Sequence, residues 1–148
     1  MKSFKFAFRG IASTIANERN MRIHLCFAFY VIAAGIATKI APGEWMLLLV
    51  CIGLVTALEC VNTAVESLCD TLHPEYSKGI KLTKDAAAGA VLLAAIFSAA
   101  AGGIIFFNAE KVKAALDFFN SCKLLSIILI ISLIPAVFFV RGRKRDKK

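Results

Sequence analysis

Residues 45–69 read WMLLLVCIGLVTALECVNTAVESLC, an apolar stretch that turns polar over its second half. A helix that crosses a bilayer needs about 20 mainly apolar residues, so this stretch is long enough to span. Its first half is uncharged, whereas Glu59, Asn62 and Glu66 interrupt its second half. The stretch therefore predicts a membrane helix with a polar face toward one end.

The polar residues of this stretch continue to Asp70 and lie on one side of the predicted helix. Glu59, Asn62, Glu66 and Asp70 stand at i, i+3, i+7 and i+11, which is one stripe at 100° per residue. A carboxylate inside a membrane helix is energetically costly, so it usually faces a polar interior and has a functional role. The alternative is that the carboxylates toward the end of the helix, Glu66 and Asp70, simply lie in water. This alternative carries more weight for Asp70, at the helix end, than for Glu59, deeper in the span.

The composition of the whole chain agrees with a membrane protein. The 148 residues are 59% hydrophobic and carry a net charge of +8. The basic residues gather near the N-terminus, between apolar segments and in the tail 141–148, which is typical of loops on the cytoplasmic side of a membrane. We therefore expect no nucleic-acid partner. The five cysteines form no C-x-x-C pair and predict no zinc or redox site.

The chain divides into an all-α membrane core, residues 1–107, and a C-terminal addition, residues 108–148. Residues 3–20 are expected to form an amphipathic surface helix, because Phe4, Phe8, Ile11 and Ile15 recur at helical spacing. Spans are expected at about 23–41, 45–69 and 86–107, with a tight turn at 41–44 and a polar loop or helix start at 77–85. Residues 108–123 read as a connector, 124–140 as a fourth span, and the rest as a basic tail.

The distribution of lysines and arginines orients these spans. With the N-terminus in the cytoplasm, the loop 70–85 and the basic tail both lie inside only if 124–140 also spans. The positive-inside rule therefore favours four spans, and it places the polar stripe near the cytoplasmic face.

Further polar residues are expected at the same membrane face. Lys84 and Asp85 open the third span, and Glu18 ends the surface helix. Carboxylates suit Mg²⁺, which takes one or two oxygen ligands from protein and others from phosphates, and a lysine can hold phosphate. No Walker A sequence or soluble-kinase motif occurs. The residues alone leave two readings: an enzyme that uses Mg–nucleotide in phosphoryl transfer, or a proton- or cation-coupled transporter with acidic relays.

A resemblance to a known family favours the first reading. Residues 58–93, LECVNTAVESLCDTLHPEYSKGIKLTKDAAAGAVLL, resemble the signature of the prokaryotic diacylglycerol kinase family, E-x-x-N-[ST]-A-x-E-x-x-x-D followed by a K-D pair. The upstream NERNMRIH, residues 17–24, resembles the first acidic segment of that family. The likeness covers roughly residues 3–107, and the fourth apolar segment and basic tail are not part of the usual three-span core.

The resemblance implies an ATP-dependent lipid kinase of the bacterial plasma (inner) membrane, a homotrimer with active sites shared between subunits. It implies that Glu59 accepts the proton of the lipid hydroxyl, that Asn62 orients the reacting groups, and that Glu18 and Glu66 bind Mg²⁺ and the nucleotide. It further implies that ATP is contacted by five residues: Glu75, Tyr76, Ser77, Lys84 and Asp85.

The lipid substrate implied by the resemblance is undecaprenol or diacylglycerol. NERNMRIH and HPEYS look more like the undecaprenol kinase branch, with His24 where diacylglycerol-preferring relatives tend to carry an acid. The alternative is that His24 is an ordinary interfacial residue.

Overall fold

The computed structural model describes residues 2–72, 75 and 77–142, and these residues are helical with no strand. The all-α fold expected from the sequence is confirmed. The seven helices of the described residues are α1 (Lys2–Asn17), α2 (Arg19–Ala37), α3 (Pro42–Leu72), α4 (Lys78–Phe106), α5 (Ala109–Ser121), α6 (Lys123–Ile131) and α7 (Leu133–Arg141).

Four helical stretches are long and apolar enough to cross a membrane: α2, α3, α4, and α6 with α7 taken together as Lys123–Arg141. Their outward surfaces carry large apolar side chains that would be unfavourable in water, among them Phe97 and Ile104, which are 72% and 82% exposed. Lipid can cover such a surface without the cost that water would impose. The chain is therefore a multi-pass membrane protein.

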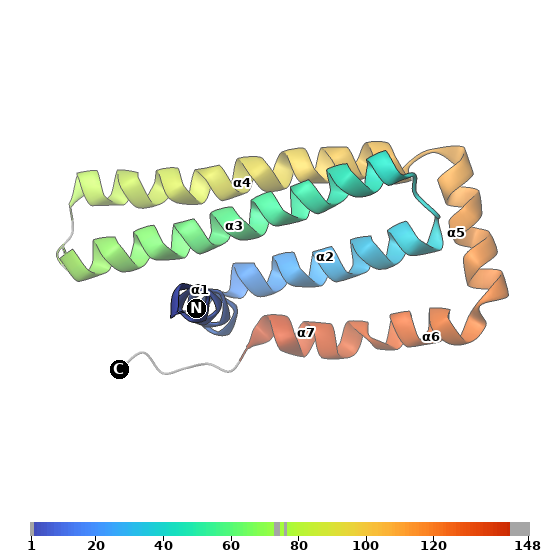
Figure 1. Ribbon diagram of the computed structural model, residues 1–148, viewed down its shortest axis with the longest axis horizontal. Coiled ribbons are helices and arrows are strands. Elements are labelled where there is room, and N and C mark those ends of the chain that lie inside the picture. Colours follow the sequence, from blue (N-terminus) through green and yellow to red (C-terminus); the bar gives the residue numbers. More distant parts are fainter. Residues whose placement is uncertain (1, 73–74, 76, 143–148) are drawn as a thin grey trace.

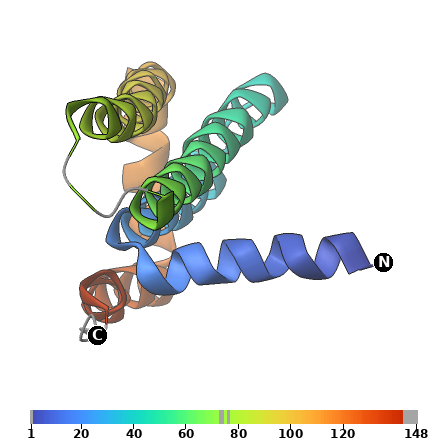
Figure 2. The ribbon, with the colours of Figure 1, turned by 90° about the vertical axis from the view of Figure 1, so that its left-hand side faces the viewer.

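The four spans run side by side, while α1 lies across them (Figure 1). Seen from the side, α1 projects away from the bundle nearly at right angles to it (Figure 2). Phe4, Phe6 and Phe8 on α1 are all exposed. This is the placement expected of a helix that rests in the membrane interface, although α1 ends at Asn17 rather than at residue 20.

The two central helices are longer than a bilayer is thick. At 1.5 Å per residue, the 31 residues of α3 and the 29 of α4 extend about 46 Å and about 44 Å. The hydrocarbon core is only about 30 Å thick. Figure 1 shows the end where α3 meets α4 reaching past α1. Residues 78–85, expected as a loop or helix start, belong to α4, because lysine and leucine favour a helix and Ser77 has the extended backbone of an N-cap.

The chain turns between α2 and α3 slightly earlier than expected. The turn covers Thr38 to Ala41, where Lys39 has a positive φ of 51°, and Pro42 is already the first residue of α3. Proline suits this position because its missing N–H would have no partner in the first helical turn. The backbone N–H of Ala41 donates to Glu44 Oε2 at 2.6 Å, and Lys111 of α5 donates to the same oxygen at 3.0 Å.

The C-terminal span is broken into two helices at Ser132. Pro135 has no N–H to donate to the carbonyl of Ile131, and this missing bond explains why the helix is interrupted there. Ser132 Oγ donates to the carbonyl of Leu129 at 2.7 Å, which satisfies one carbonyl at the break. The two halves continue in nearly the same direction, and α7 packs along α2 (Figure 1).

Candidate active site

The centre of the polar stripe is buried within the bundle. Glu59 on α3 is 1% exposed, and its Oε2 has no hydrogen-bond partner among the residues that the structure describes. Thr63 Oγ1 donates to the backbone carbonyl of Glu59 at 2.9 Å, so that hydroxyl does not serve the carboxylate. A buried carboxylate oxygen without a partner is energetically unfavourable, and such groups are found where a ligand or substrate supplies the missing partner.

One helical turn further along α3, Asn62 and Glu66 form a hydrogen-bonded pair. Asn62 Nδ2 donates to Glu66 Oε1 at 3.0 Å. Asn62 is 7% exposed, and its Oδ1 is a second buried acceptor with no partner within the described chain. The amide thus holds Glu66 in place while its own oxygen remains available.

Glu59 and Asn62 line a pocket of about 240 Å³ between three helices. From α2 the pocket receives Asn20, Ile23 and His24. From α4 it receives only apolar residues, namely Ala88, Val91, Leu92 and Ala95. The pocket therefore combines polar groups on one side with an apolar wall on the other, which suits an amphipathic molecule with a hydroxyl group at its polar end.

Glu18 reaches this site from a different part of the sequence. It occupies the elbow between α1 and α2, where its extended backbone (φ −98°, ψ 122°) interrupts the two helices. Glu18 and Glu66 are both close enough to Glu59 for Coulombic repulsion among the carboxylates. Three carboxylates, one from the elbow and two from α3, are thus close enough to interact electrostatically.

A second polar group lies further out on the same two central helices. Lys84 of α4 forms an ion pair with Asp70 of α3, and it also interacts electrostatically with Glu66. Glu75, Ser77 and Asp85 are exposed around the junction of α3 and α4. Tyr76, also expected to contact nucleotide, lies outside the described residues. The structure therefore places the stripe and the Lys84–Asp85 pair at one end of the bundle.

The carboxylates fit a magnesium ion by their chemistry, though not as a complete cage. Within the described part of the chain, no group of three or more His, Cys, Asp or Glu side chains is arranged to hold a metal. Mg²⁺ commonly takes one or two protein carboxylates and completes its shell with water and phosphate oxygens. Glu18 and Glu66, one of them held by Asn62, offer such an incomplete set.

Sequence reasoning missed one polar residue of the pocket, Asn20, and the apolar residues that complete its lining. Asn20 lines the pocket beside His24, one helical turn away on α2. Its position within NERNMRIH, two residues after Glu18, was the available signal. The signal was weak because a lone asparagine near a helix start is usually explained by capping.

The two members of the ion pair at the helix junction, Lys84 and Asp70, are expected to differ in their effect on ATP binding. Asp70 is 68% exposed and Lys84 is 32% exposed, so we expect Asp70→Asn to change the free energy of unfolding by less than about 1 kcal/mol. If Lys84 binds a nucleotide phosphate, Lys84→Met raises the KM for ATP about tenfold, whereas Asp70→Asn changes it little. Initial rates at varied ATP, with thermal unfolding of both variants, check this. Equal effects of Lys84→Met and Asp70→Asn on the KM for ATP would contradict a distinct role for Lys84.

The fold and the site define the class of protein. It is a multi-pass helical membrane protein with a carboxylate and amide site at one end of its bundle. The family model for prokaryotic diacylglycerol kinase matches residues 5–106. The chain belongs to this family, and its activity is that of an ATP-dependent lipid kinase.

Individual relatives agree with this assignment. The chain is 39% identical to the undecaprenol kinase of Bacillus subtilis, over 71% of this chain and 85% of that protein. It is 39% identical to a diacylglycerol kinase of Synechocystis, over 70% of this chain and 59% of that protein. It is 32% identical to the diacylglycerol kinase of Haemophilus influenzae, over 72% of this chain and 92% of that protein. No solved structure matches the chain significantly.

Proposed function

We propose that this chain transfers the γ-phosphate of Mg–ATP to the hydroxyl of a membrane lipid alcohol, with undecaprenol favoured over diacylglycerol. The observation that carries the proposal is the buried Oε2 of Glu59, which has no partner within the described residues, in a pocket with one polar and one apolar side. A lipid alcohol matches both sides, because its hydroxyl can donate to Glu59 and its hydrocarbon chain can lie against α4.

In the proposed reaction, Glu59 acts as the general base. The lipid hydroxyl donates its proton to Glu59 Oε2 as the hydroxyl oxygen attacks the γ-phosphorus. A new P–O bond forms, the bond between the γ-phosphorus and the bridging oxygen breaks, and ADP leaves. Asn62, whose Oδ1 is free and buried, orients the reacting groups beside Glu59. Positioning of this kind accounts for much of the catalysis in phosphoryl transfer.

Glu18 and Glu66 are the proposed magnesium ligands. Their role is supported by their shared proximity to Glu59 and by the hydrogen bond that fixes Glu66. When bound, Mg²⁺ would neutralise the charge that accumulates on the transferred phosphoryl group. Without a cation, three neighbouring carboxylates would repel the triphosphate, so the charge of the site itself supports this role.

The remaining parts of the nucleotide are proposed to lie along the junction of α3 and α4. Lys84 would hold phosphate oxygens, and the surrounding contacts would come from Glu75, Tyr76, Ser77 and Asp85. The lysines of this end of the bundle support a cytoplasmic active site in the bacterial plasma membrane. Exposed residues at the junction are available to a neighbouring copy, which supports the homotrimer with shared sites that the family resemblance implies.

Substrate preference is the finer part of the proposal. His24 lines the same pocket as Glu59, so it is in a position to contact the lipid headgroup, which favours a selecting role over an ordinary interfacial one. Undecaprenol carries a single hydroxyl at the end of a hydrocarbon chain, whereas diacylglycerol adds two ester groups. The wall that α4 contributes is entirely apolar and has no side chain to bond the two esters, which suits the first of these better.

A panel of lipid alcohols tests the function and the preference together. Purified protein in micelles is given Mg–ATP and either undecaprenol, diacylglycerol or a simple long-chain alcohol, and initial rates are compared. We expect kcat/KM for undecaprenol to exceed that for diacylglycerol by about tenfold. His24→Glu, which introduces the acid typical of diacylglycerol-preferring relatives, is expected to narrow this ratio. Absence of phosphorylation with every alcohol would refute the function, whereas a reversed ratio would refute only the preference.

A further inference from the structure

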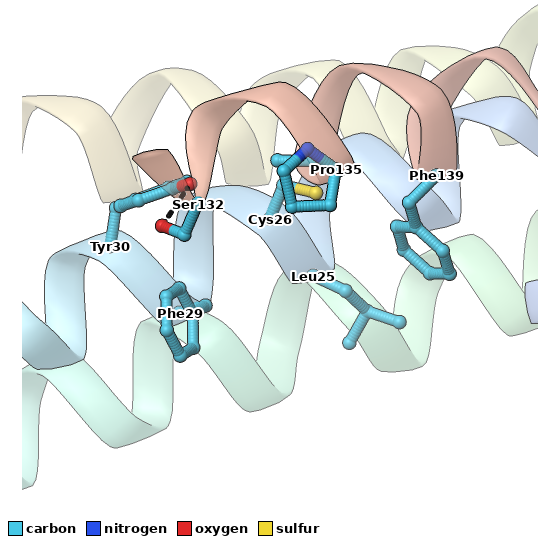
Figure 3. Close-up of a pocket in the computed structure, with 8 residues that line it drawn as sticks. Leu25, Cys26, Phe29, Tyr30, Ser132, Pro135 and Phe139 are labelled. Atoms are coloured by element: carbon cyan, nitrogen blue, oxygen red, sulfur yellow. Dashed lines mark hydrogen bonds between the residues drawn. The ribbon is translucent and has the colours of Figure 1, made fainter. Parts of the chain in front are cut away.

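The C-terminal span is held against α2, although it lies beyond the residues that match the family. The family match ends at residue 106, and α6 and α7 follow it. α7 faces α2 across a mainly apolar pocket of about 310 Å³, where the Tyr30 hydroxyl and Ser132 Oγ share a hydrogen bond of 3.0 Å (Figure 3). This pocket lies on a different set of α2 residues from those that line the Glu59 site. The added span therefore contacts the catalytic core through α2.

Arg22 of α2 joins α1 to this arrangement. Its side chain is buried, and Nη1 donates to the carbonyls of Ile15 and Ala16, each at 3.0 Å. These carbonyls belong to the last turn of α1, where a helix leaves acceptors unsatisfied. Arg22 thus closes the end of α1 and spans the elbow in which Glu18 stands.

The C-terminal end of α7 meets the same guanidinium group. Gly142 caps α7 with a positive φ of 61°, and a Cβ added there would stand 2.6 Å from Arg22 Nη2 and 2.9 Å from Arg22 Cζ. Glycine adopts this backbone without the strain that a side chain would impose, and a Cβ added at Gly142 would require the end of the Arg22 side chain to shift. Because the C-terminus of a helix carries partial negative charge, the cation of Arg22 is favourable at the ends of both α1 and α7.

We propose that the C-terminal span positions the Glu18 elbow through the contact of Gly142 with Arg22, so that both are positioning residues for Mg–ATP. The inference rests on the proposed role of Glu18 as a magnesium ligand. The guanidinium is fixed from one side by Gly142 and in turn fixes the end of α1. Movement of Arg22 would release the elbow and shift Glu18 relative to the site on α3. The lipid site, built from α3 and α4 with other residues of α2, would be affected less.

Gly142→Ala tests this contact in the full-length protein. The direct readout is hydrogen exchange without ATP or lipid, since the amide of Glu18 is bonded to the Thr14 carbonyl at 2.8 Å and reports on the elbow. We expect exchange over residues 14–22 to rise about tenfold, with α3 and α4 unchanged. We expect the KM for Mg–ATP to rise about tenfold, with kcat and the lipid KM within about twofold of the wild type. Gly43→Ala controls for an added methyl group in open space, because a Cβ there meets nothing within 4 Å and Gly142 is the one described glycine with a positive φ.

Arg22→Lys supplies the second variant needed if Gly142→Ala folds poorly. Lysine keeps the positive charge but lacks the planar fork that bonds two carbonyls, so we expect the same elbow-specific rise in exchange. Gly142→Ala added to Arg22→Lys should change exchange little further, because the clashing Nη2 is gone.

Three results would overturn the positioning role: unchanged exchange at the elbow, a rise spread equally over all helices, or a raised exchange with an unchanged KM for Mg–ATP. Additive effects of the two substitutions would also overturn it. Failure of the proposed function looks different, because the wild type would then phosphorylate no lipid alcohol while the exchange experiment could still be read.

Discussion

Glu59→Gln is expected to lower kcat by about 10³-fold or more while leaving the protein folded. The amide of glutamine has nearly the shape of the carboxylate but does not accept a proton at neutral pH. Because Glu59 is 1% exposed and its Oε2 has no partner in the described chain, removal of its charge is not expected to destabilise the fold. Rates of phosphate transfer from ATP to a lipid alcohol in micelles, together with thermal unfolding, measure both effects.

The matched control for this variant is Glu44→Gln on the same helix. Glu44 lies at the opposite end of α3, where it accepts hydrogen bonds from Ala41 and Lys111. Its replacement makes the same chemical change without touching the pocket, so kcat should stay within about twofold of the wild type while the protein becomes slightly less stable. A Glu59→Gln protein with wild-type turnover would show that Glu59 is not the base. Loss of folding in that variant would show that its carboxylate is structural.

Glu66→Gln is expected to weaken the response to magnesium more than any other property. Removal of a metal ligand should raise the Mg²⁺ concentration needed for half-maximal rate by about 10- to 100-fold, since even outer contacts to ligands have effects of this size. Glu18→Gln should behave in the same way, because the two carboxylates are proposed to share one ion. Mn²⁺ bound to the protein in the presence of nucleotide, followed by electron paramagnetic resonance, measures the affinity without relying on turnover.

Glu110→Gln is the control for the magnesium experiment. Glu110 is exposed in the first turn of α5, outside the site, and its replacement should leave the magnesium dependence unchanged. If Glu66→Gln lowered the rate at every Mg²⁺ concentration by the same factor, Glu66 would act on the reacting groups rather than on the metal. An effect of Glu66→Gln without any effect of Glu18→Gln would remove Glu18 from the proposed ligand set.

Much of the site could be predicted from the sequence because α3 is a continuous helix. The spacing of Glu59, Asn62 and Glu66 determines their common face, and helical geometry is local. The hydrogen bond from Asn62 to Glu66 is an i, i+4 contact of the same kind. Helix ends were less predictable: the sequence left residues 77–85 open between a loop and a helix start, and the structure has residues 78–85 as the start of α4, because a helix can continue past the membrane into water.

Contacts between residues far apart in the sequence could not be predicted from the pattern of polar and apolar residues. The sequence indicated that Glu18 lies at the same membrane face as Glu66, but only the elbow between α1 and α2 brings it near Glu59. Asn20 lines the pocket because α2, α3 and α4 pack around it, which the sequence alone does not show. The sequence also left the purpose of the fourth span open, and the structure shows that this span lies along α2 and ends against Arg22.

The sequence by itself determined that residues 45–69 form a membrane helix with a polar stripe, since hydropathy and helical period depend only on neighbouring residues. It also determined the family, because the spacing of the acidic and amide residues is a property of the chain. The tertiary structure alone decided that Glu59 is buried with no partner for Oε2 among the described residues, that a pocket opens beside it, and that Gly142 lies near Arg22. The physical reason is that burial and long-range contact depend on how separate helices pack, which no local pattern specifies.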